Sequence, residues 1–164
     1  MNRIWKPRTW KPNVTVAALI EQDGRYLLVE EETDNGVCFN QPAGHLDEGE
    51  SLVAACGREA LEETAYHFTP AALVGVYQWP RPNLANAMNH EDNITYLRFA
   101  FAGTLGAHEA GRQLDEGILR AVWMTPQEIQ ASAARHRSPL VWQCVADHLA
   151  GQRFPLEVIR HYAA

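Results

Sequence analysis

Three glutamates, Glu59, Glu62 and Glu63, are spaced so that they would share one side of a helix. At about 100° per residue, their carboxylates fall within an arc of roughly 100°. Like charges at this spacing destabilise an isolated helix by about 0.2 to 0.5 kcal/mol per pair. A divalent cation would reverse that repulsion, and hard oxygen ligands suit Mg²⁺ or Mn²⁺. The alternative is a solvated acidic helix face, because most charge runs do no chemistry.

The residues around these glutamates predict the helix that carries them, over about 51–65. Ser51 has the side chain expected of an N-cap residue. A narrow stripe of small and apolar residues lies on the opposite side, which indicates close packing against the rest of the protein. The stripe consists of Ala54, Gly57, Leu61 and Ala65. We therefore expect a helix with one acidic side and one tightly packed side.

The segment from Gly44 to Tyr66 resembles the Nudix box, the 23-residue signature of the Nudix hydrolases, usually written GX5EX7REUXEEXGU. Its six fixed positions that match are Gly44, Glu50, Arg58, Glu59, Glu62 and Glu63. The departures are Ala65 in place of a glycine, and Ala60 and Tyr66 at the two aliphatic positions. All charged members are retained. The resemblance implies that Glu59, Glu62 and Glu63 hold the metal, with the carbonyl of Ala43 as a further ligand.

Segments outside the box are similar to the NudJ-type phosphatases, a bacterial subgroup of this superfamily, from about Trp10 to Ile159. They are WKPNVTVAALI, FNQPAGH, YQWPRP, YLRFAF, RSPLV and GQRFPLEVI. The resemblance implies a Nudix fold, in which a mixed β-sheet is sandwiched between α-helices. It also implies hydrolysis of nucleoside di- and triphosphates and of thiamine or hydroxymethylpyrimidine diphosphate, with release of inorganic phosphate. Two alternatives are a Nudix pyrophosphohydrolase for ADP-ribose or oxidised nucleotides, and a non-catalytic domain that senses nucleotides.

Length and composition favour one domain over residues 1–164, since 46% hydrophobic residues provide enough apolar material for a core. The net charge of -6 argues against a nucleic-acid partner. No apolar run is long enough to span a membrane, and MNRIWKPRTWKPN has no apolar stretch, so we expect a cytoplasmic protein without a membrane partner. Three cysteines without a CxxC motif indicate neither a disulfide framework nor a zinc site. The resembling subgroup suggests a monomer.

Alternating apolar patterns predict the secondary structure that must position the glutamates. Strands are expected at about 13–21, 25–31, 37–41, 71–79, 94–104 and 117–124, and helices at about 51–65, from Pro126 onward and at 139–150. Strands mixed with flanking helices make an α/β (α+β) protein. We expect loops at 81–93 and 106–117 that border the substrate site, and a solvated acidic turn formed by Glu30, Glu31, Glu32 and Asp34.

Catalysis by such a site requires a base for the attacking water, and two glutamates are candidates. Glu59 belongs to the box, whereas Glu116 lies in the expected loop 106–117 and is preferred over Asp115 as the downstream acid. Arg58 is an i,i+4 neighbour of Glu62, so its guanidinium is expected to orient that metal ligand. The alternative for Arg58 is an ordinary surface ion pair.

Substrate recognition is expected from residues beyond the metal helix. Trp79, Tyr77 and Tyr96 have rings that can stack on a pyrimidine or another heteroaromatic group. Arg98 has a guanidinium that can meet phosphate oxygens, and His45 is near the phosphates by its position in the box loop. Aromatic residues in strands usually belong to the core, and this alternative stays open for all three rings.

Overall fold

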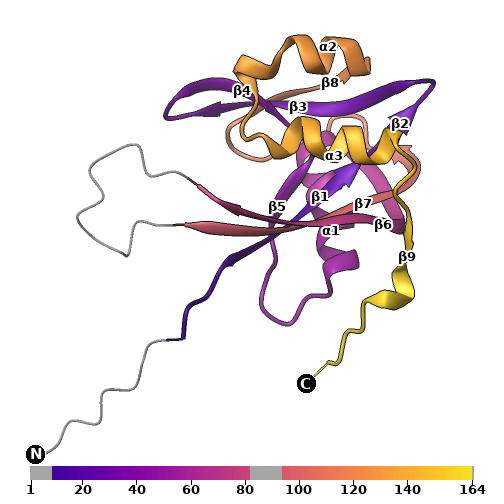
Figure 1. Cartoon of the computed structure of the whole chain (residues 1–164). Helices are drawn as coiled ribbons and strands as arrows, with labels where there is room; N and C mark the ends of the chain where they lie inside the picture. The colour runs from indigo at the N-terminus through magenta and orange to yellow at the C-terminus, as the bar shows by residue number, and fades with distance from the viewer. Residues whose placement is uncertain (1–8, 82–93, 164) are drawn as a thin grey trace, which may run out of the picture.

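The computed structural model describes residues 9–81 and 94–163, which form two sheets with helices packed on them (Figure 1). The strands are β1 (Asn13–Leu19), β2 (Glu21–Gln22), β3 (Arg25–Thr33), β4 (Gly36–Asn40), β5 (Ala43–His45), β6 (Tyr66–Pro80), β7 (Thr95–His108), β8 (Ile118–Met124) and β9 (Phe154–Pro155). The α-helices are α1 (Leu52–Thr64), α2 (Pro126–Ala131) and α3 (Leu140–Leu149), and 3-10 turns are η2 (Ala133–Arg135) and η3 (Leu156–Val158). In the larger sheet the order is β5-β1-β7-β6-β9, and in the smaller one β2-β3-β4 with β8 paired to β3.

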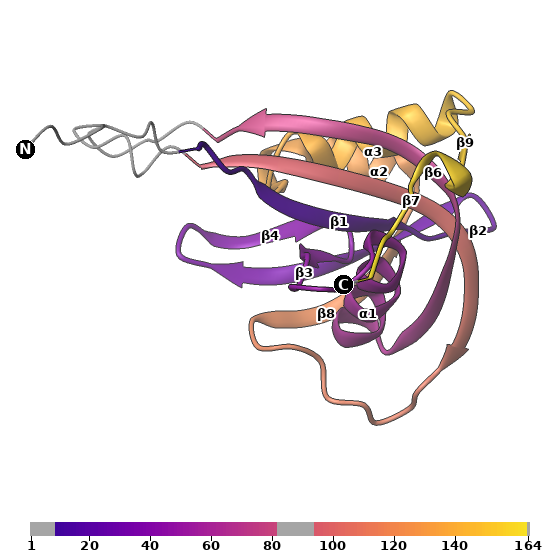
Figure 2. The ribbon, with the colours of Figure 1, turned by 90° about the horizontal axis from the view of Figure 1, so that it is seen from below.

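Strand β1 is central to the fold because both of its faces are buried. It pairs in parallel with β7 and antiparallel with β5, so the larger sheet is mixed. Ala17 and Leu19 belong to the apolar cluster that includes α3, whereas Val16 and Ala18 belong to the cluster that includes α1. Helices therefore cover opposite faces of this sheet, as Figures 1 and 2 show. The expected sandwich of a mixed sheet between helices is confirmed.

The ends of the helices follow their capping residues. Ser51 accepts a hydrogen bond from the Ala54 N–H at 3.1 Å, as expected of the N-cap of α1. Thr125 and Glu128 form a capping box at the start of α2, with Pro126 in its first turn. Ala65 ends α1 with φ of 60° and ψ of 12°, a left-handed conformation that glycine adopts at less cost. The departure of Ala65 from the box therefore carries backbone strain.

Three expected boundaries are corrected by the structure. Strand β6 begins at Tyr66 rather than near 71, and β7 continues to His108, so the expected loop 106–117 is in part a strand. Glu30, Glu31 and Glu32 lie within β3 rather than in a solvated turn. Pairing with β8 and ion pairs to Glu30 from Arg120 and Arg135 keep these residues in the strand. Of the expected loop 81–93, all but its first residue lies outside the described residues.

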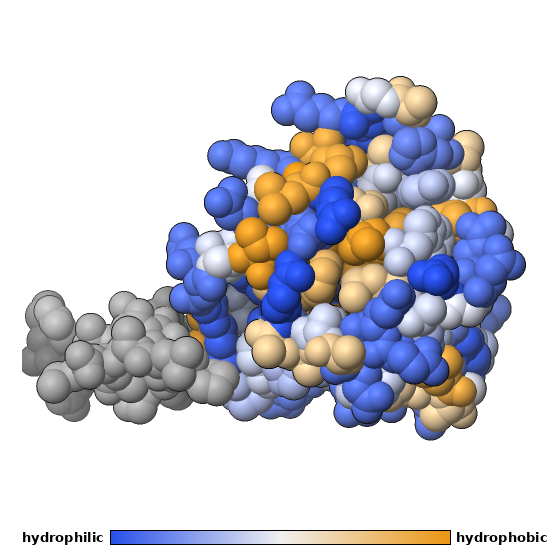
Figure 3. All heavy atoms as spheres, turned by 90° about the horizontal axis from the view of Figure 1, so that it is seen from above, coloured by the Kyte–Doolittle hydropathy of each residue, from blue (hydrophilic) through white to orange (hydrophobic). Residues whose placement is uncertain are grey.

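One face of the molecule combines hydrophilic and hydrophobic side chains. Seen from above, a band of hydrophobic atoms crosses a largely hydrophilic face (Figure 3). In the part of the chain that the structure describes, no helix has both the length and the apolar character needed to cross a bilayer.

Candidate active site

Strand β5 and helix α1 approach each other closely where Gly44 meets Glu59. A Cβ atom on Gly44 would stand 2.1 Å from the Glu59 carboxyl carbon and 2.2 Å from each of its oxygens. Real Cβ atoms do not come so near, so any side chain at position 44 would displace either the strand or the carboxylate. Glycine therefore leaves the space in which the Glu59 carboxylate lies against the β5 backbone.

Arg58 joins the helix to the loop through a fork of hydrogen bonds. Its Nε and Nη2 donate to the two carboxylate oxygens of Glu50, each at 2.9 Å, and Nη2 also donates to the His45 carbonyl at 3.0 Å. Its Nη1 donates to Glu59 at 2.8 Å and to Glu62 at 2.9 Å. This guanidinium lowers the pKa of Glu50. Arg58 thus fixes the positions of two predicted metal ligands relative to the loop.

Two of the glutamates are almost fully buried. Glu59 is 8% exposed and Glu63 is 7% exposed. Burial raises the pKa of Glu63 to about 8, an effect opposed by the Ala43 N–H, which donates to its carboxylate at 2.9 Å. Burial also raises the pKa of Glu59, although the neighbouring Arg58 acts in the opposite direction. Buried carboxylates whose negative charge is destabilised in this way favour a bound cation.

The three box glutamates fit a hard divalent cation by their chemistry, although their side chains are otherwise engaged here. Among the residues described, no group of three His, Cys, Asp or Glu side chains is arranged to hold one ion. Arg58 occupies oxygens of Glu59 and Glu62, and Glu63 accepts the Ala43 N–H. A metal would therefore replace the Arg58 Nη1 group as the partner of the Glu59 and Glu62 carboxylates.

Two further acids lie close enough to influence the buried carboxylates. The charge of Asp115 raises the pKa of Glu59 and Glu63, and the Asp115 N–H donates to the Glu62 carbonyl at 3.1 Å. Glu31, on β3, also raises the pKa of Glu63. The neighbouring Glu116 is exposed and has neither of these links among the described contacts. The charges of Asp115 and Glu31 thus reach the buried glutamates, and the role of Glu116, the downstream acid preferred from the sequence, stays a prediction.

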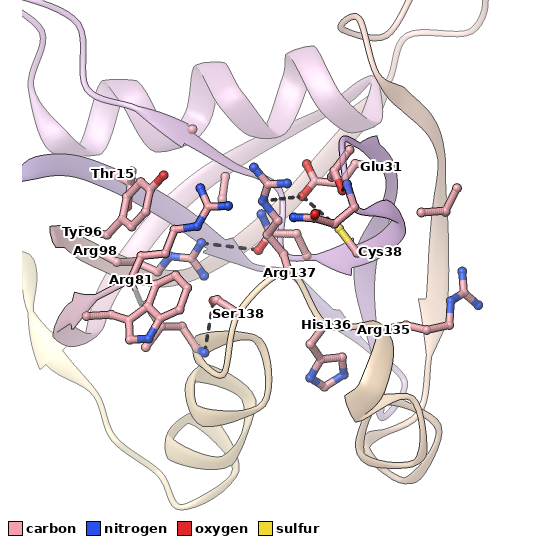
Figure 4. Close-up of a pocket in the computed structure, with 18 of the residues that line it drawn as sticks. Thr15, Glu31, Cys38, Arg81, Tyr96, Arg98, Arg135, His136, Arg137 and Ser138 are labelled. Carbon is pink, nitrogen blue, oxygen red and sulfur yellow. Dashed lines mark hydrogen bonds and ion pairs between the residues drawn. The ribbon is translucent and has the colours of Figure 1, made fainter. Parts of the chain in front are cut away.

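A cavity of about 690 Å³ opens beside the loop that follows β4 (Figure 4). It is lined by Ala43, Gly44 and His45 on the side of the box, and further along by Trp79, Tyr96 and Arg98. The rings of Trp79 and Tyr96 stack, with centroids 5.9 Å apart and planes 19° from parallel. The four predicted substrate residues, His45, Trp79, Tyr96 and Arg98, therefore share one cavity.

Tyr77 does not line this cavity. Its hydroxyl donates to Asp147 at 2.8 Å, and its ring packs against the cluster of apolar residues beneath α3. Trp79 packs against the same cluster while also lining the cavity. Tyr77 is thus packed as a core residue, whereas Trp79 both packs against the core and lines the cavity.

The NUDIX domain, as a protein family, matches residues 9–143 of the sequence. The chain therefore belongs to the Nudix family and is a hydrolase that acts on anhydride bonds in phosphorus-containing compounds. Members of this family generally use divalent metals, which agrees with the chemistry of the buried glutamates.

Individual relatives and solved structures are similar to this chain over most of its length. The chain is 37% identical over 150 residues to proteins named phosphatase NudJ from Escherichia coli K12 and from Shigella flexneri, covering 92% of this chain and 92% of each relative. Its fold is similar to a NUDIX hydrolase structure from Nitrosomonas europaea, with a TM-score of 0.84, 49% identity, and coverage of 93% and 98% of the two chains. The E. coli ORF135 protein is similar in fold, with a TM-score of 0.64, 21% identity, and coverage of 85% of this chain and 90% of that one.

Proposed function

We propose that the chain, acting as one domain over residues 1–164, is a metal-dependent phosphatase of phosphoanhydrides. Its substrates would be nucleoside di- and triphosphates and thiamine or hydroxymethylpyrimidine diphosphate, and its product inorganic phosphate. The observation that carries this proposal is the pair of buried carboxylates, Glu59 and Glu63, packed against the backbone of β5. The similarity to proteins named phosphatase NudJ supports the release of phosphate rather than pyrophosphate.

Glu59, Glu62 and Glu63 would hold Mg²⁺ or Mn²⁺, with the Ala43 carbonyl as a further ligand. When bound, such a metal neutralises phosphoryl charge and lowers the pKa of a water molecule. Arg58 would then keep its hydrogen bonds to Glu50 and to the His45 carbonyl, and these bonds hold the loop against the helix.

The proton of the attacking water would pass to a nearby carboxylate. Glu59 and Glu116 are the bases predicted from the sequence, and Asp115 joins them because its charge influences Glu59. A carboxylate with a raised pKa is a better base near neutral pH than an unperturbed one.

Substrate binding would use the cavity beside the box loop. The exposed faces of the Trp79 and Tyr96 pair offer an apolar surface for a heteroaromatic ring. His45 lies next to Gly44 at the box end of the cavity, and Arg98 lines the cavity together with Trp79 and Tyr96. The partner would be a small molecule rather than a nucleic acid or a membrane, and the enzyme a cytoplasmic monomer.

The test is a screen of diphosphate and triphosphate substrates with Mg²⁺ or Mn²⁺, in which phosphate and pyrophosphate are assayed separately. We expect metal-dependent release of inorganic phosphate from nucleoside diphosphates and from thiamine diphosphate. Pyrophosphate as the sole inorganic product would instead indicate a pyrophosphohydrolase of another specificity. Nucleotide binding without turnover would indicate a sensing domain.

A further inference from the structure

Arg98 is a buried cation without an acidic partner in the described part of the chain. The residue is 7% exposed, and no carboxylate forms an ion pair with it among the described residues. Its Nη1 donates to the Gln41 amide oxygen at 3.2 Å and its Nη2 to the Asn40 amide oxygen at 3.4 Å. These neutral acceptors orient the guanidinium without cancelling its charge. A buried charge without compensation is destabilising, so the arrangement requires an explanation.

Two polar atoms beside this charge also lack a partner. The Nε of Arg98 and the hydroxyl of Thr15 are buried and have no hydrogen-bond partner in the described structure, although the Arg98 guanidinium lies near the buried Cys144 thiol. Thr15 on β1 is the register partner of Arg98 on β7, so the two side chains lie on the same face of the sheet. Native proteins satisfy most buried polar atoms. Two orphan atoms on paired residues, both lining one cavity, indicate that a missing partner belongs there.

The surroundings of Arg98 add positive charge to the same cavity. Arg81, Arg135 and Arg137 also line it, against a single acid, Glu31. Figure 4 shows the guanidinium groups of Arg81, Arg98 and Arg137 near the middle of the view. Arg137 pairs with Glu31 at 3.5 Å and Arg135 with Glu30, whereas Arg81 has no ion pair among the described residues. This excess of positive charge contrasts with a net charge of -6 for the whole chain.

From these observations we infer that Arg98 forms the floor of an oxyanion subsite, separate from the box glutamates. Its ligand would be a phosphate group of the substrate other than the one held at the metal. The Nε–H and the remaining terminal N–H groups of Arg98 would donate to that group, and Arg81 would add charge from the rim. Thr15 would supply a neutral donor, and both buried donors would reach the ligand after a small side-chain shift. The identity of the oxyanion as a substrate phosphate rests on the proposed function, but binding of an oxyanion does not.

The binding test uses the purified chain in EDTA, so that no metal takes part. Inorganic phosphate is added while ionic strength is held constant with sodium chloride, and the melting temperature is recorded. At a phosphate concentration ten times Kd, we expect a rise of about 3 to 6 °C. Arg98→Gln should abolish this rise, Thr15→Val should reduce it, and Arg98→Lys should retain part of it. Acetate in place of phosphate shows whether a carboxylate serves as well; an equal response to acetate would contradict the assignment to phosphate.

The stability of the variants separates binding from a structural role. Removing an uncompensated buried charge should leave the melting temperature of Arg98→Gln without phosphate unchanged or higher, whereas a purely structural arginine would lower it. Arg120→Gln, which removes an exposed arginine paired with Glu30, is the matched control and should respond to phosphate like the wild type. If Arg98→Gln does not fold, Arg98→Lys and Thr15→Val still report on the subsite. An unchanged phosphate response in all three, or no response in the wild type, would overturn the inference.

A kinetic test connects the subsite to catalysis. With a nucleoside diphosphate and Mg²⁺, Arg98→Gln should raise KM at least about tenfold while kcat changes less, the pattern for an interaction present in both the ground state and the transition state. Phosphate binding by a wild-type protein that has no turnover would refute the proposed function and leave the subsite standing. Turnover with an unchanged KM in Arg98→Gln would refute binding of a substrate phosphate at the subsite and leave the proposed function standing.

Discussion

Gly44 and Glu59 lie so close that a Cβ on the glycine would be 2.1 Å from the carboxyl carbon. Gly44→Ala should therefore displace the carboxylate or the β5 backbone. We expect a loss of about 1 to 3 kcal/mol in the free energy of unfolding, as for other overpacked sites. We also expect kcat/KM to fall by at least about tenfold, because small misplacements of reacting groups are costly. Chemical denaturation and steady-state kinetics on the same preparations measure the two effects.

Gly24→Ala provides the control for this substitution. Gly24 has φ of 75°, so alanine is strained there, yet an added Cβ would meet no atom within 4 Å. This variant should lose stability without losing turnover. Equal losses of kcat/KM in both variants would attribute the effect of Gly44→Ala to general destabilisation.

Arg58→Lys tests whether the arginine fork positions the metal ligands. Lysine keeps the positive charge but cannot bond Glu50 through two nitrogens while also contacting Glu59 and Glu62. Outer-shell partners of metal ligands are typically worth 10- to 100-fold in activity or metal affinity, and we expect a loss of about that size. Arg120→Lys, in a side chain that is 64% exposed, should change neither quantity. Wild-type metal affinity and kcat in Arg58→Lys would show that the fork is only a surface ion pair.

Glu63→Gln removes the charge of a buried predicted ligand and retains its shape. We expect kcat to fall by at least about two orders of magnitude, on the scale of removing a strong electrostatic contributor. The heat of Mg²⁺ binding, measured by calorimetry, should fall with it, while circular dichroism shows an unchanged fold. Wild-type turnover together with wild-type binding heat in Glu63→Gln would exclude this residue from the metal site.

Asp115→Asn and Glu116→Gln separate the two downstream acids. Both residues are exposed, but only the charge of Asp115 influences the ionisation of the two buried glutamates among the described contacts. We therefore expect the larger loss of kcat, about tenfold or more, in Asp115→Asn, since general bases contribute about 10²- to 10⁴-fold. The dependence of kcat on pH, measured for both variants, identifies which one loses the basic limb. A larger loss in Glu116→Gln would confirm Glu116 as the downstream acid, as the sequence predicts.

His148 should make the protein less stable in mild acid. Burial lowers its pKa from 6.5 to about 4, and the Tyr26 hydroxyl lies 2.6 Å from its Nδ1. As pH falls below 6.5 the unfolded chain takes up a proton at His148, while the folded chain does not until about pH 4. The unfolded state binds more protons in this window, so the free energy of unfolding decreases, by up to about 3 kcal/mol.

Urea denaturation at several pH values between 6.5 and 4.5 measures this dependence. His148→Gln should reduce the change in the free energy of unfolding with pH. Losing the contact with Tyr26 lowers stability by the same amount at every pH, so it does not affect this slope. His136, whose pKa is also lowered by burial, accounts for part of the remaining slope. His161→Gln, in an exposed residue, is the control substitution. An unaltered slope in His148→Gln would show that this histidine is protonated equally in both states.

Local patterns in the sequence predict the helix that carries the box glutamates well. The expected helix at 51–65 becomes α1 at Leu52–Thr64, because a capping serine and an amphipathic pattern are local properties. The sequence pattern predicts a strand only from about residue 71, whereas β6 begins at Tyr66, because Pro70 weakens a strand pattern. The structure accommodates Pro70 at a shift in register between β6 and β7. Pairing over such a long ribbon depends on the partner strand, which a local pattern does not include.

The site itself was only partly predictable for a related reason. The spacing within the box identifies Glu59, Glu62 and Glu63, since helical geometry alone brings them together. Glu31 and Asp115 come from β3 and from the segment before β8, and only tertiary packing places their charges near Glu63. The burial of Arg98 likewise depends on Asn40 and Gln41, which are more than fifty positions away in the sequence.

Strand β1 is buried on both faces, and this limits how the substrate specificity of the enzyme can change. One strand carries Thr15 beneath the cavity, and its next residue, Val16, is buried in the cluster that includes α1. The distance from the box glutamates on α1 to Thr15 in the cavity lining is therefore set by a strand that packs on both of its faces. Evolution of new specificity in this scaffold should proceed by exchanging side chains along the cavity rim, because lengthening or shortening that span would disrupt two cores at once.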